Sequence, residues 1–156
     1  MKITKQGLIT KIISGGQTGV DRAALDVAIA LGFEYGGFCP RGRLAEDGVI
    51  PDKYNLRELK SSKYLKRTHK NVKMSDGSLI LHSGIVFGGT LKTIEYCQIQ
   101  NKPFITINLL DNLNQIQVNF NHWMIENNIT ILNVAGPRES EETVYNKTFS
   151  LLIELL

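Results

Sequence analysis

Three glycine-containing segments of the chain could cradle an anion. They are SGGQTG at residues 14–19, FGGT at 87–90 and AGPRES at 135–140, and each precedes a pattern typical of a helix. Glycine lets backbone N–H groups approach an anion without a Cβ in the way, and the dipole of the following helix favours negative charge at its start. The chemistry that these segments favour together is the binding of a phosphate group. The alternative is that each glycine segment only permits a tight turn.

Side chains that suit the same chemistry lie in or beside these segments. Hydroxyl donors are supplied by Thr18, Thr90 and Thr93. Arginines that could form charge-assisted hydrogen bonds to phosphate are Arg22, Arg41, Arg43 and Arg138. Asp21 follows the first segment directly, and it either contacts the ligand or compensates the dipole at the start of a helix.

Two familiar nucleotide fingerprints are absent from the sequence. SGGQTG matches neither GxGxxG nor GxxxxGK[ST], which disfavours both a standard dinucleotide dehydrogenase and a P-loop NTPase. The two cysteines, Cys39 and Cys97, have no CxxC or histidine partner at metal-ligand spacing. We therefore expect no structural metal.

The elements that must position these residues alternate between short apolar runs and helical patterns, which indicates parallel strands connected by helices. We expect an α/β fold with a doubly wound, mainly parallel sheet of about five strands and helices on both faces. The expected strands lie at 11–14, 34–39, 78–81, within 102–110 and within 129–134. The expected helices lie at 20–31, 56–63, 90–100, 116–126 and 137–156, with Pro137 in the first turn of the last one.

Composition sets the wider limits. The 156 residues, 42% of them hydrophobic, suit one domain spanning 1–156. The opening MKITKQGLITK lacks the apolar core of a secretory signal, and no stretch approaches the roughly 20 apolar residues of a membrane span. With so few cysteines, we expect a cytoplasmic protein without membrane contact. The apolar stripe Ile116, Phe120, Trp123 and Met124 indicates either core or a subunit interface, and we expect a homo-oligomer.

Positive charge is concentrated in one segment. The net charge is only +3, but residues 53–73 contain eight Lys or Arg against the single acid Glu58, a local charge of +7. This segment could attract a phosphorylated ligand or a nucleic acid, or form a solvated helix face. Aromatic residues are sparse there, only Tyr54 and Tyr64, and no nucleic-acid motif accompanies the charge, so we do not expect a nucleic-acid partner.

Four separated stretches together resemble a known family. SGGQTGVDRAALD, GGFCPRGRLAEDGVIP, RTHKNVKMSDGSLIL and FGGTLKTIEYC are similar to the molybdenum carrier family, in the circularly permuted branch of the SLOG superfamily. The resemblance covers nearly the whole chain. It implies a Rossmann-like domain that binds a nucleotide or nucleotide-like ligand, with the molybdenum cofactor, a phosphorylated pterin, as the ligand behind the family name.

The same superfamily contains the LONELY GUY type phosphoribohydrolases, which cleave the N-glycosidic bond of nucleoside monophosphates. Their pattern is an arginine, an aspartate nine residues later and PGGxGTxxE, in which the arginine and the last glutamate serve catalysis. Arg67 and Asp76 keep the nine-residue spacing, and Glu95 takes the place of the glutamate. Phe87 replaces the proline, residues 91–92 replace GT, and about five extra residues precede the glycines. If the chain is a hydrolase, Arg67 holds the phosphate and Glu95 positions water.

The sequence thus predicts a binding protein for a small phosphorylated, nucleotide-like ligand, with a nucleoside monophosphate phosphoribohydrolase as the alternative. It does not decide between binding and turnover. The predicted ligand-binding residues are Gly15, Gly16, Gln17, Thr18, Gly19, Asp21, Arg22, Arg41, Gly42, Arg43, Asp76, Gly88, Gly89, Thr90, Thr93 and Gly136. The predicted cofactor is the molybdenum cofactor or a nucleotide.

Overall fold

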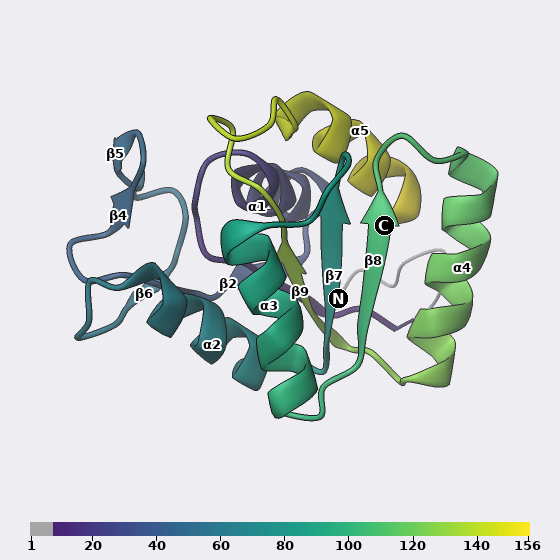
Figure 1. Cartoon of the computed structure of the whole chain (residues 1–156), viewed down its shortest axis with the longest axis horizontal. Helices are drawn as coiled ribbons and strands as arrows, with labels where there is room; N and C mark the ends of the chain where they lie inside the picture. Colours follow the sequence, from purple (N-terminus) through teal and green to yellow (C-terminus); the bar gives the residue numbers. More distant parts are fainter. Residues whose placement is uncertain (1–7) are drawn as a thin grey trace.

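The computed structural model describes residues 8–156. The expectation that the first residues carry no secretory signal concerns in part residues 1–7, which lie outside this range. Five parallel strands form the central sheet, in the order β2-β1-β9-β7-β8 (Figure 1). These strands are β1 (Lys11–Ile13), β2 (Glu34–Gly36), β7 (Gly77–His82), β8 (Phe104–Asn108) and β9 (Ile131–Ala135). The α/β, doubly wound architecture predicted from the sequence is confirmed.

The order of the central strands follows the Rossmann pattern when the chain is read cyclically from β9. In that reading the strands follow one another as β9, β1, β2, β7, β8, and their places in the sheet become 3-2-1-4-5. From β9 the cyclic path proceeds to β1 on one side, and from β7 it proceeds to β8 on the other. The carboxyl ends of β9 and β7 therefore flank the switch point, where sheets of this kind bind ligands.

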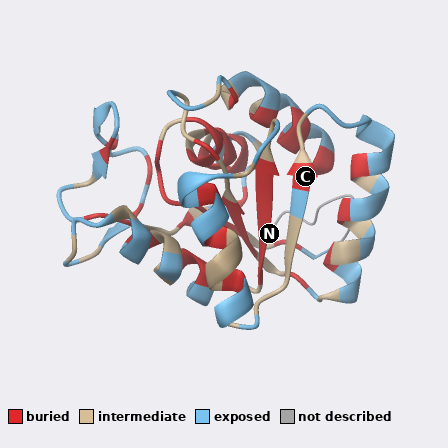
Figure 2. Cartoon of the chain, in the orientation of Figure 1, coloured by how far each residue is buried: buried red, intermediate tan, exposed pale blue. Residues whose placement is uncertain are grey.

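Helices cover both faces of the sheet. Helices α1 (Val20–Leu31), α4 (Leu113–Glu126) and α5 (Tyr145–Leu155) pack on one face, and α2 (Tyr64–Met74) and α3 (Gly88–Ile99) pack on the other (Figure 1). The alternation of side chains along β7 explains this arrangement, because Leu79 and Leu81 enter the first core and Ile80 enters the second. Figure 2 shows β7 as a buried strand in the middle of the molecule.

An irregular region follows β2 and has its own small core. It contains β3 (Phe38–Cys39) paired with β6 (Arg57–Glu58), and the antiparallel pair β4 (Leu44–Ala45) and β5 (Gly48–Val49). Buried side chains of this core include Leu25 from α1, Ile50 and Tyr54. The predicted strand over 34–39 is interrupted at Gly37, whose φ is 127°, where a Cβ would collide with the Ser14 carbonyl oxygen.

One predicted helix and the start of another were wrong. Residues 56–63 form no helix, because the amides of Arg57 and Leu59 bond the carbonyls of Gly37 and Cys39 at 2.9 Å and pair this segment with β3. The basic helix is α2, which begins at Tyr64. The last helix begins at Tyr145 and not at Pro137, whose carbonyl instead accepts a hydrogen bond from the amide that starts α1, at 3.3 Å. Within the described residues, no helix is long and apolar enough to span a bilayer.

Candidate functional site

The loop between β1 and α1 depends on its glycines for shape. Gly16 and Gly19 have φ values of 77° and 81°, in the left-handed region that side chains disfavour. A Cβ on Gly19 would lie 2.6 Å from the Pro137 carbonyl oxygen, so this loop is packed directly against the loop that follows β9. Gly136 is equally confined, since its Cβ would lie 2.6 Å from the Leu81 oxygen. Two of the three predicted glycine segments therefore form one tight layer above the sheet.

Gly15 makes room for an arginine of α2. Nη1 of Arg67 donates a hydrogen bond to the Gly15 carbonyl at 2.8 Å, and a Cβ on Gly15 would lie only 2.7 Å from Cζ of Arg67. Arg67 is 7% exposed. Its side chain is thus held under the loop by the absence of a side chain at Gly15.

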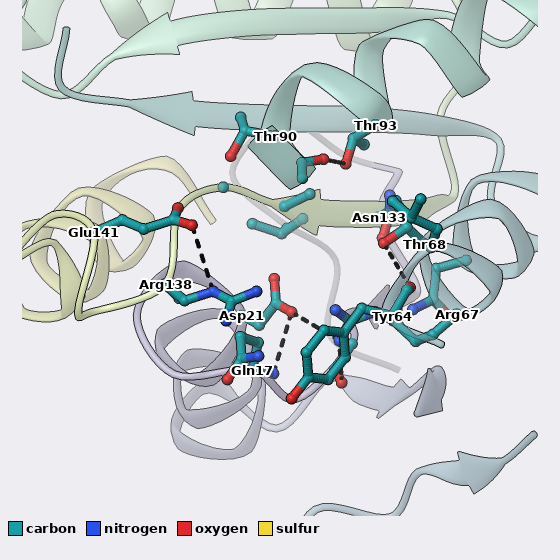
Figure 3. A pocket seen from close by; sticks show the side chains of 17 residues that line it. Gln17, Asp21, Tyr64, Arg67, Thr68, Thr90, Thr93, Asn133, Arg138 and Glu141 are labelled. Carbon is teal, nitrogen blue, oxygen red and sulfur yellow. Dashed lines mark hydrogen bonds and ion pairs between the residues drawn. The ribbon is translucent and has the colours of Figure 1, made fainter. Parts of the chain in front are cut away.

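A cavity of about 70 Å³ lies above the carboxyl ends of β1 and β9, between the starts of α2 and α3 (Figure 3). Its walls come from the loop after β1, one side of α2, the first turns of α3, and β9 with the loop behind it. This is the region of the topological switch point. The third glycine segment, at the start of α3, completes the enclosure through Gly89 and Thr90.

Two pairs of opposite charges line the cavity. Nη1 of Arg67 lies 3.5 Å from Oδ2 of Asp21, and Nε of Arg138 lies 3.5 Å from Oε1 of Glu141. Both guanidinium groups lie near the ring of Tyr64, at 5.6 and 5.3 Å from its centroid. Burial raises the pKa of the Asp21 carboxyl, against the lowering effects of Arg67 and of the hydrogen bond from the Gln17 amide.

Several hydrogen-bond donors of the cavity wall are free for a ligand. Oε1 of Gln17 accepts from the amides of Thr18 and Glu46, at 3.1 and 2.9 Å, while its buried Nε2 has no partner among the described residues. Helix α3 begins at Gly88 without a side-chain cap, and a Cβ at Gly89 would meet nothing within 4 Å. No side chain caps the first amides of α3, and the buried Thr90 lines the cavity beside them.

Arg67, Asp76 and Glu95, the three residues that match the phosphoribohydrolase pattern, do not come together in the structure. Arg67 lines the cavity, but Asp76 lies before the amino end of β7 and accepts from Thr130 and Ile131 there. Glu95 pairs with Lys92 at 2.7 Å and does not line the cavity. On a helix, two residues correspond to a rotation of about 200°, so Glu95 points away from the side on which Thr93 lies.

The remaining predicted arginines stabilise the irregular region. Arg22 donates to the Gly16 carbonyl at 2.9 Å and forms a double hydrogen bond with Asp47, at 2.7 and 2.8 Å. The guanidinium of Arg43 donates to four backbone carbonyls between residues 50 and 56. Arg41 is exposed, and neither it nor Gly42 lines the cavity, although the Gly42 amide donates to Glu58 at 2.6 Å.

Glu46 joins the irregular region to the loop after β9. Its carboxylate accepts hydrogen bonds from the hydroxyls of Thr18 and Ser140 and from the Ser140 amide, the last at 3.1 Å. Desolvation by itself would raise the pKa of Glu46, but the hydrogen bonds from Ser140 and Thr18 together outweigh it and lower this pKa. Thr18 is thus engaged with Glu46 and with the Glu139 amide, at 3.2 Å, and lies outside the cavity lining.

Sequence reasoning missed much of the cavity wall that α2 supplies. Tyr64, Thr68 and Asn71 line the cavity together with Arg67, and their spacing of three and four residues puts them on one side of the helix. That spacing was a usable signal, but it fell outside the segment where the helix was expected. Asn133 and Glu141 carried no signal of their own in the sequence.

Comparisons with known proteins agree on one relationship. The model of the family described as "Circularly permutated YpsA SLOG family" matches residues 12–156. A crystal structure from Syntrophus aciditrophicus SB, of a protein named a "putative molybdenum carrier protein", is 46% identical and has a TM-score of 0.93, with 95% of each chain covered. A search of curated proteins finds no significant match. The chain belongs to the circularly permuted YpsA family of the SLOG superfamily.

Proposed function

We propose that residues 1–156 form one binding domain for a small phosphorylated, nucleotide-like ligand, and that its phosphate enters the cavity between β9, α2 and α3. The observation that carries this proposal is the buried Nε2 of Gln17, an amide donor without a partner among residues 8–156, on a side chain that lines a cavity shared with Arg67. A buried donor without an acceptor costs about 1–3 kcal/mol, and a bound oxyanion removes that cost.

The size of the cavity supports entry of the phosphate alone. Pockets that enclose a whole ligand measure roughly 300–1,000 Å³, well above the 70 Å³ found here. A water-sized sphere needs about 10–15 Å³ by the same measure, so the cavity holds a group of a few heavy atoms. We propose that the rest of the ligand stays at the mouth of the cavity, beside Tyr64 and Leu65, both of which line it.

The molybdenum cofactor is our first candidate for the ligand. It carries a phosphate on a pterin, and a molybdenum-related ligand is suggested by the name of the structural neighbour from Syntrophus aciditrophicus. The unpartnered side-chain Nε2 of Gln17 and the uncapped first turn of α3 fit the phosphate of this cofactor. Arg67, Gln17 and Thr90 would hold that phosphate. A nucleotide presents the same phosphate chemistry and is the second candidate.

Titration calorimetry tests the proposal. AMP, GMP and the molybdenum cofactor are each titrated into the purified protein. The same titrations are repeated with the Gln17→Leu variant, which keeps the side-chain volume but removes the side-chain amide. We expect binding of at least one ligand with a Kd below 1 mM, which is about −4.1 kcal/mol, and a loss of about tenfold in the variant. If none binds, or if Gln17→Leu binds equally well, the proposal fails.

Hydrolysis of a nucleoside monophosphate is not part of our proposal. The alternative needs a carboxylate beside the scissile bond, and Glu95 is paired with Lys92 outside the cavity. The two buried free cysteines, Cys39 and Cys97, suit a reducing compartment, so we propose a cytoplasmic location.

We also propose that two copies of the chain associate through β8 and α4. Residues 103–125 contain Asp111 as their single Asp, Glu, Lys or Arg, in a chain that is 21% charged. In a two-fold interface the same surface patch meets itself and residues near the axis lie beside their own copies, so an uncharged patch avoids like-charge contacts. β8 is also an edge strand, and Val118 and Ile125 of α4 are 63% and 59% exposed. A second copy would pair this edge and cover these side chains.

A further inference from the structure

Asp21 has one carboxylate oxygen in contact with the protein and one that faces the cavity. Oδ2 accepts the Gln17 amide at 3.2 Å and lies 3.5 Å from Arg67. The Ser14 hydroxyl also lies within hydrogen-bonding reach of the Asp21 carboxyl, and Figure 3 shows the second oxygen of Asp21 pointing into the cavity. Asp21 is only 7% exposed, so whatever occupies the cavity becomes the neighbour of this oxygen.

The charges of the cavity wall cancel. Arg67 and Arg138 are matched by Asp21 and Glu141. A bound oxyanion therefore meets donors on several sides but also the carboxylate of Asp21. An ionised carboxylate can only accept hydrogen bonds, and a fully deprotonated oxyanion can only accept them too. Close contact between the two is repulsive unless a proton lies between them.

The surroundings of Asp21 favour such a proton. Arg67 faces it from α2, Arg22 from α1, and Arg138 and Glu141 line the cavity from the loop after β9. Arg22 is occupied by Asp47, and Arg67 shares its Nη1 with the Gly15 carbonyl. Burial raises the pKa of Asp21 despite these arginines, so the carboxyl accepts a proton more readily than an exposed one.

We propose that Asp21 shares one proton with the bound oxyanion, and that it thereby restricts the cavity to oxyanions that can hold a proton near neutral pH. This inference rests on the proposed function. A phosphate monoester has its second pKa near 6 and can supply or accept this proton at neutral pH. Sulfate and phosphodiesters hold no such proton except in strong acid. The ligand class is therefore a terminal phosphate monoester, which excludes a phosphate inside a diester or a diphosphate bridge.

The proton balance of the step is simple. A monoanionic monoester brings its own proton, and the O–H donates to Oδ1 of Asp21. A dianionic monoester instead binds with uptake of one proton from solvent, which stays between the two oxygens. No covalent bond to phosphorus forms or breaks in either case. Binding at a pH above the second pKa of the ligand must therefore be accompanied by proton uptake.

Calorimetric titrations with inorganic phosphate, ribose 5-phosphate, sulfate and dimethyl phosphate test this inference. For the unmodified protein at pH 6.5, we expect phosphate and ribose 5-phosphate to bind at least tenfold more tightly than sulfate or dimethyl phosphate. At pH 8, we expect the enthalpy of phosphate binding to depend on the ionisation enthalpy of the buffer, in proportion to the uptake of nearly one proton. Equal binding of phosphate and sulfate, or no proton uptake, would overturn the inference.

The Asp21→Asn variant gives an independent readout. Its amide can donate to any oxyanion, so we expect the preference for phosphate over sulfate to fall below about threefold and the proton uptake to vanish. Asp52→Asn, at an exposed position outside the cavity lining, is the matched control and keeps the preference. Retained preference in Asp21→Asn would contradict the inference. If the unmodified protein binds sulfate as well as phosphate, only the role of Asp21 fails, whereas no binding of any phosphorylated ligand removes the proposed function as well.

Discussion

The guanidinium of Arg67 lies in the space that a side chain at Gly15 would occupy, and it donates to the Gly15 carbonyl at 2.8 Å. The glycine and the arginine are 52 residues apart in the sequence and come from different elements. Each therefore constrains the other: the loop after β1 cannot gain a side chain at this point without displacing the arginine from the cavity wall.

Gly15→Ala should be destabilising for this reason. The added methyl group must displace a buried guanidinium, and overpacking of this kind costs about 1–3 kcal/mol. Urea unfolding measures the change in free energy. Gly89→Ala is the control, because its Cβ enters open space at the start of α3 and should leave the stability unchanged or slightly higher. Equal stability of the two variants would show that Arg67 adjusts freely.

The pair of Arg67 and Asp21 should show strong coupling in stability. Arg67→Met leaves the Asp21 carboxylate buried without its cation, and breaking a buried pair costs about 3–5 kcal/mol. Adding Asp21→Asn removes the uncompensated charge and should restore part of this loss. The double-mutant cycle is measured by denaturant unfolding at pH 7. Additive effects of the two substitutions would contradict the coupling.

Glu95→Gln should leave ligand affinity unchanged. Its carboxylate contacts Lys92 on the side of α3 that faces away from the cavity, so it does not reach a ligand bound there. Substitutions at such positions also change the free energy of unfolding by about 0.5 kcal/mol or less, so the variant stays folded. Affinity is measured by calorimetry with the best ligand, and release of free base from AMP is measured in parallel. Base release that disappears in Glu95→Gln would revive the hydrolase interpretation.

Asp76 should make stability depend on pH in the acidic range. Partial burial alone would raise the pKa of its carboxyl, but hydrogen bonds from Thr130 and Ile131 outweigh burial and lower it below the ordinary value of 3.8. A carboxyl with a lower pKa in the folded protein contributes stability above the unfolded pKa, and this contribution is lost as pH falls through the folded pKa. We expect Asp76→Asn to cost about 1.5–3 kcal/mol at pH 7 and much less below pH 3.

Asp52→Asn provides the comparison for Asp76, since Asp52 is exposed. Thermal unfolding is recorded for both variants and the unmodified protein between pH 2.5 and 7. The difference between Asp76→Asn and the unmodified protein should shrink as the pH falls. A difference that is constant over this range would assign the effect to packing instead of charge.

Association through β8 should be sensitive to charge. Thr106 is exposed in the middle of β8, and Thr106→Lys would place two lysines beside each other in a two-fold pairing of this strand. We expect the variant to sediment as a monomer at concentrations where the unmodified protein is a dimer. Ser62→Lys, at an exposed position between β6 and α2, is the control. A monomeric unmodified protein would refute the proposed interface.

The sequence was sufficient for the sheet and for most of its helices, because the local patterns and the tertiary packing agree. Val20 to Leu31 repeats apolar residues at helical spacing and ends at Gly32, and the structure has the same helix with Gly32 as its left-handed C-cap. The helix α2 could not be located in this way. Only Leu65, Val72 and Met74 of its eleven residues are strongly apolar, so a basic helix with a narrow apolar side left little periodic signal.

The candidate site was predictable in its backbone and much less so in its side chains. The glycine segments identified the loops that meet above the sheet. Which arginine enters the cavity depended on contacts between distant residues, and Arg22 and Arg43 bind Asp47 and the carbonyls of residues 50–56 instead. The role of Gln17 required knowing that Glu46 folds back onto its Oε1, a contact across 29 residues that no spacing rule contains.

Because the positive and negative side chains of the cavity wall are paired, the association rate and the dissociation rate of a ligand depend on different parts of the protein. Paired groups such as Arg67 and Asp21 produce little field beyond the Debye length of about 8–10 Å. The exposed Lys63 and Lys66 lie at the start of α2, and that helix contains no acidic residue to pair with them. They would therefore govern the association rate and its dependence on salt, while the dissociation rate is set by the buried donors and changes little with ionic strength. The surface of α2 and the cavity beside it can thus be altered independently, one to change capture and the other to change residence time.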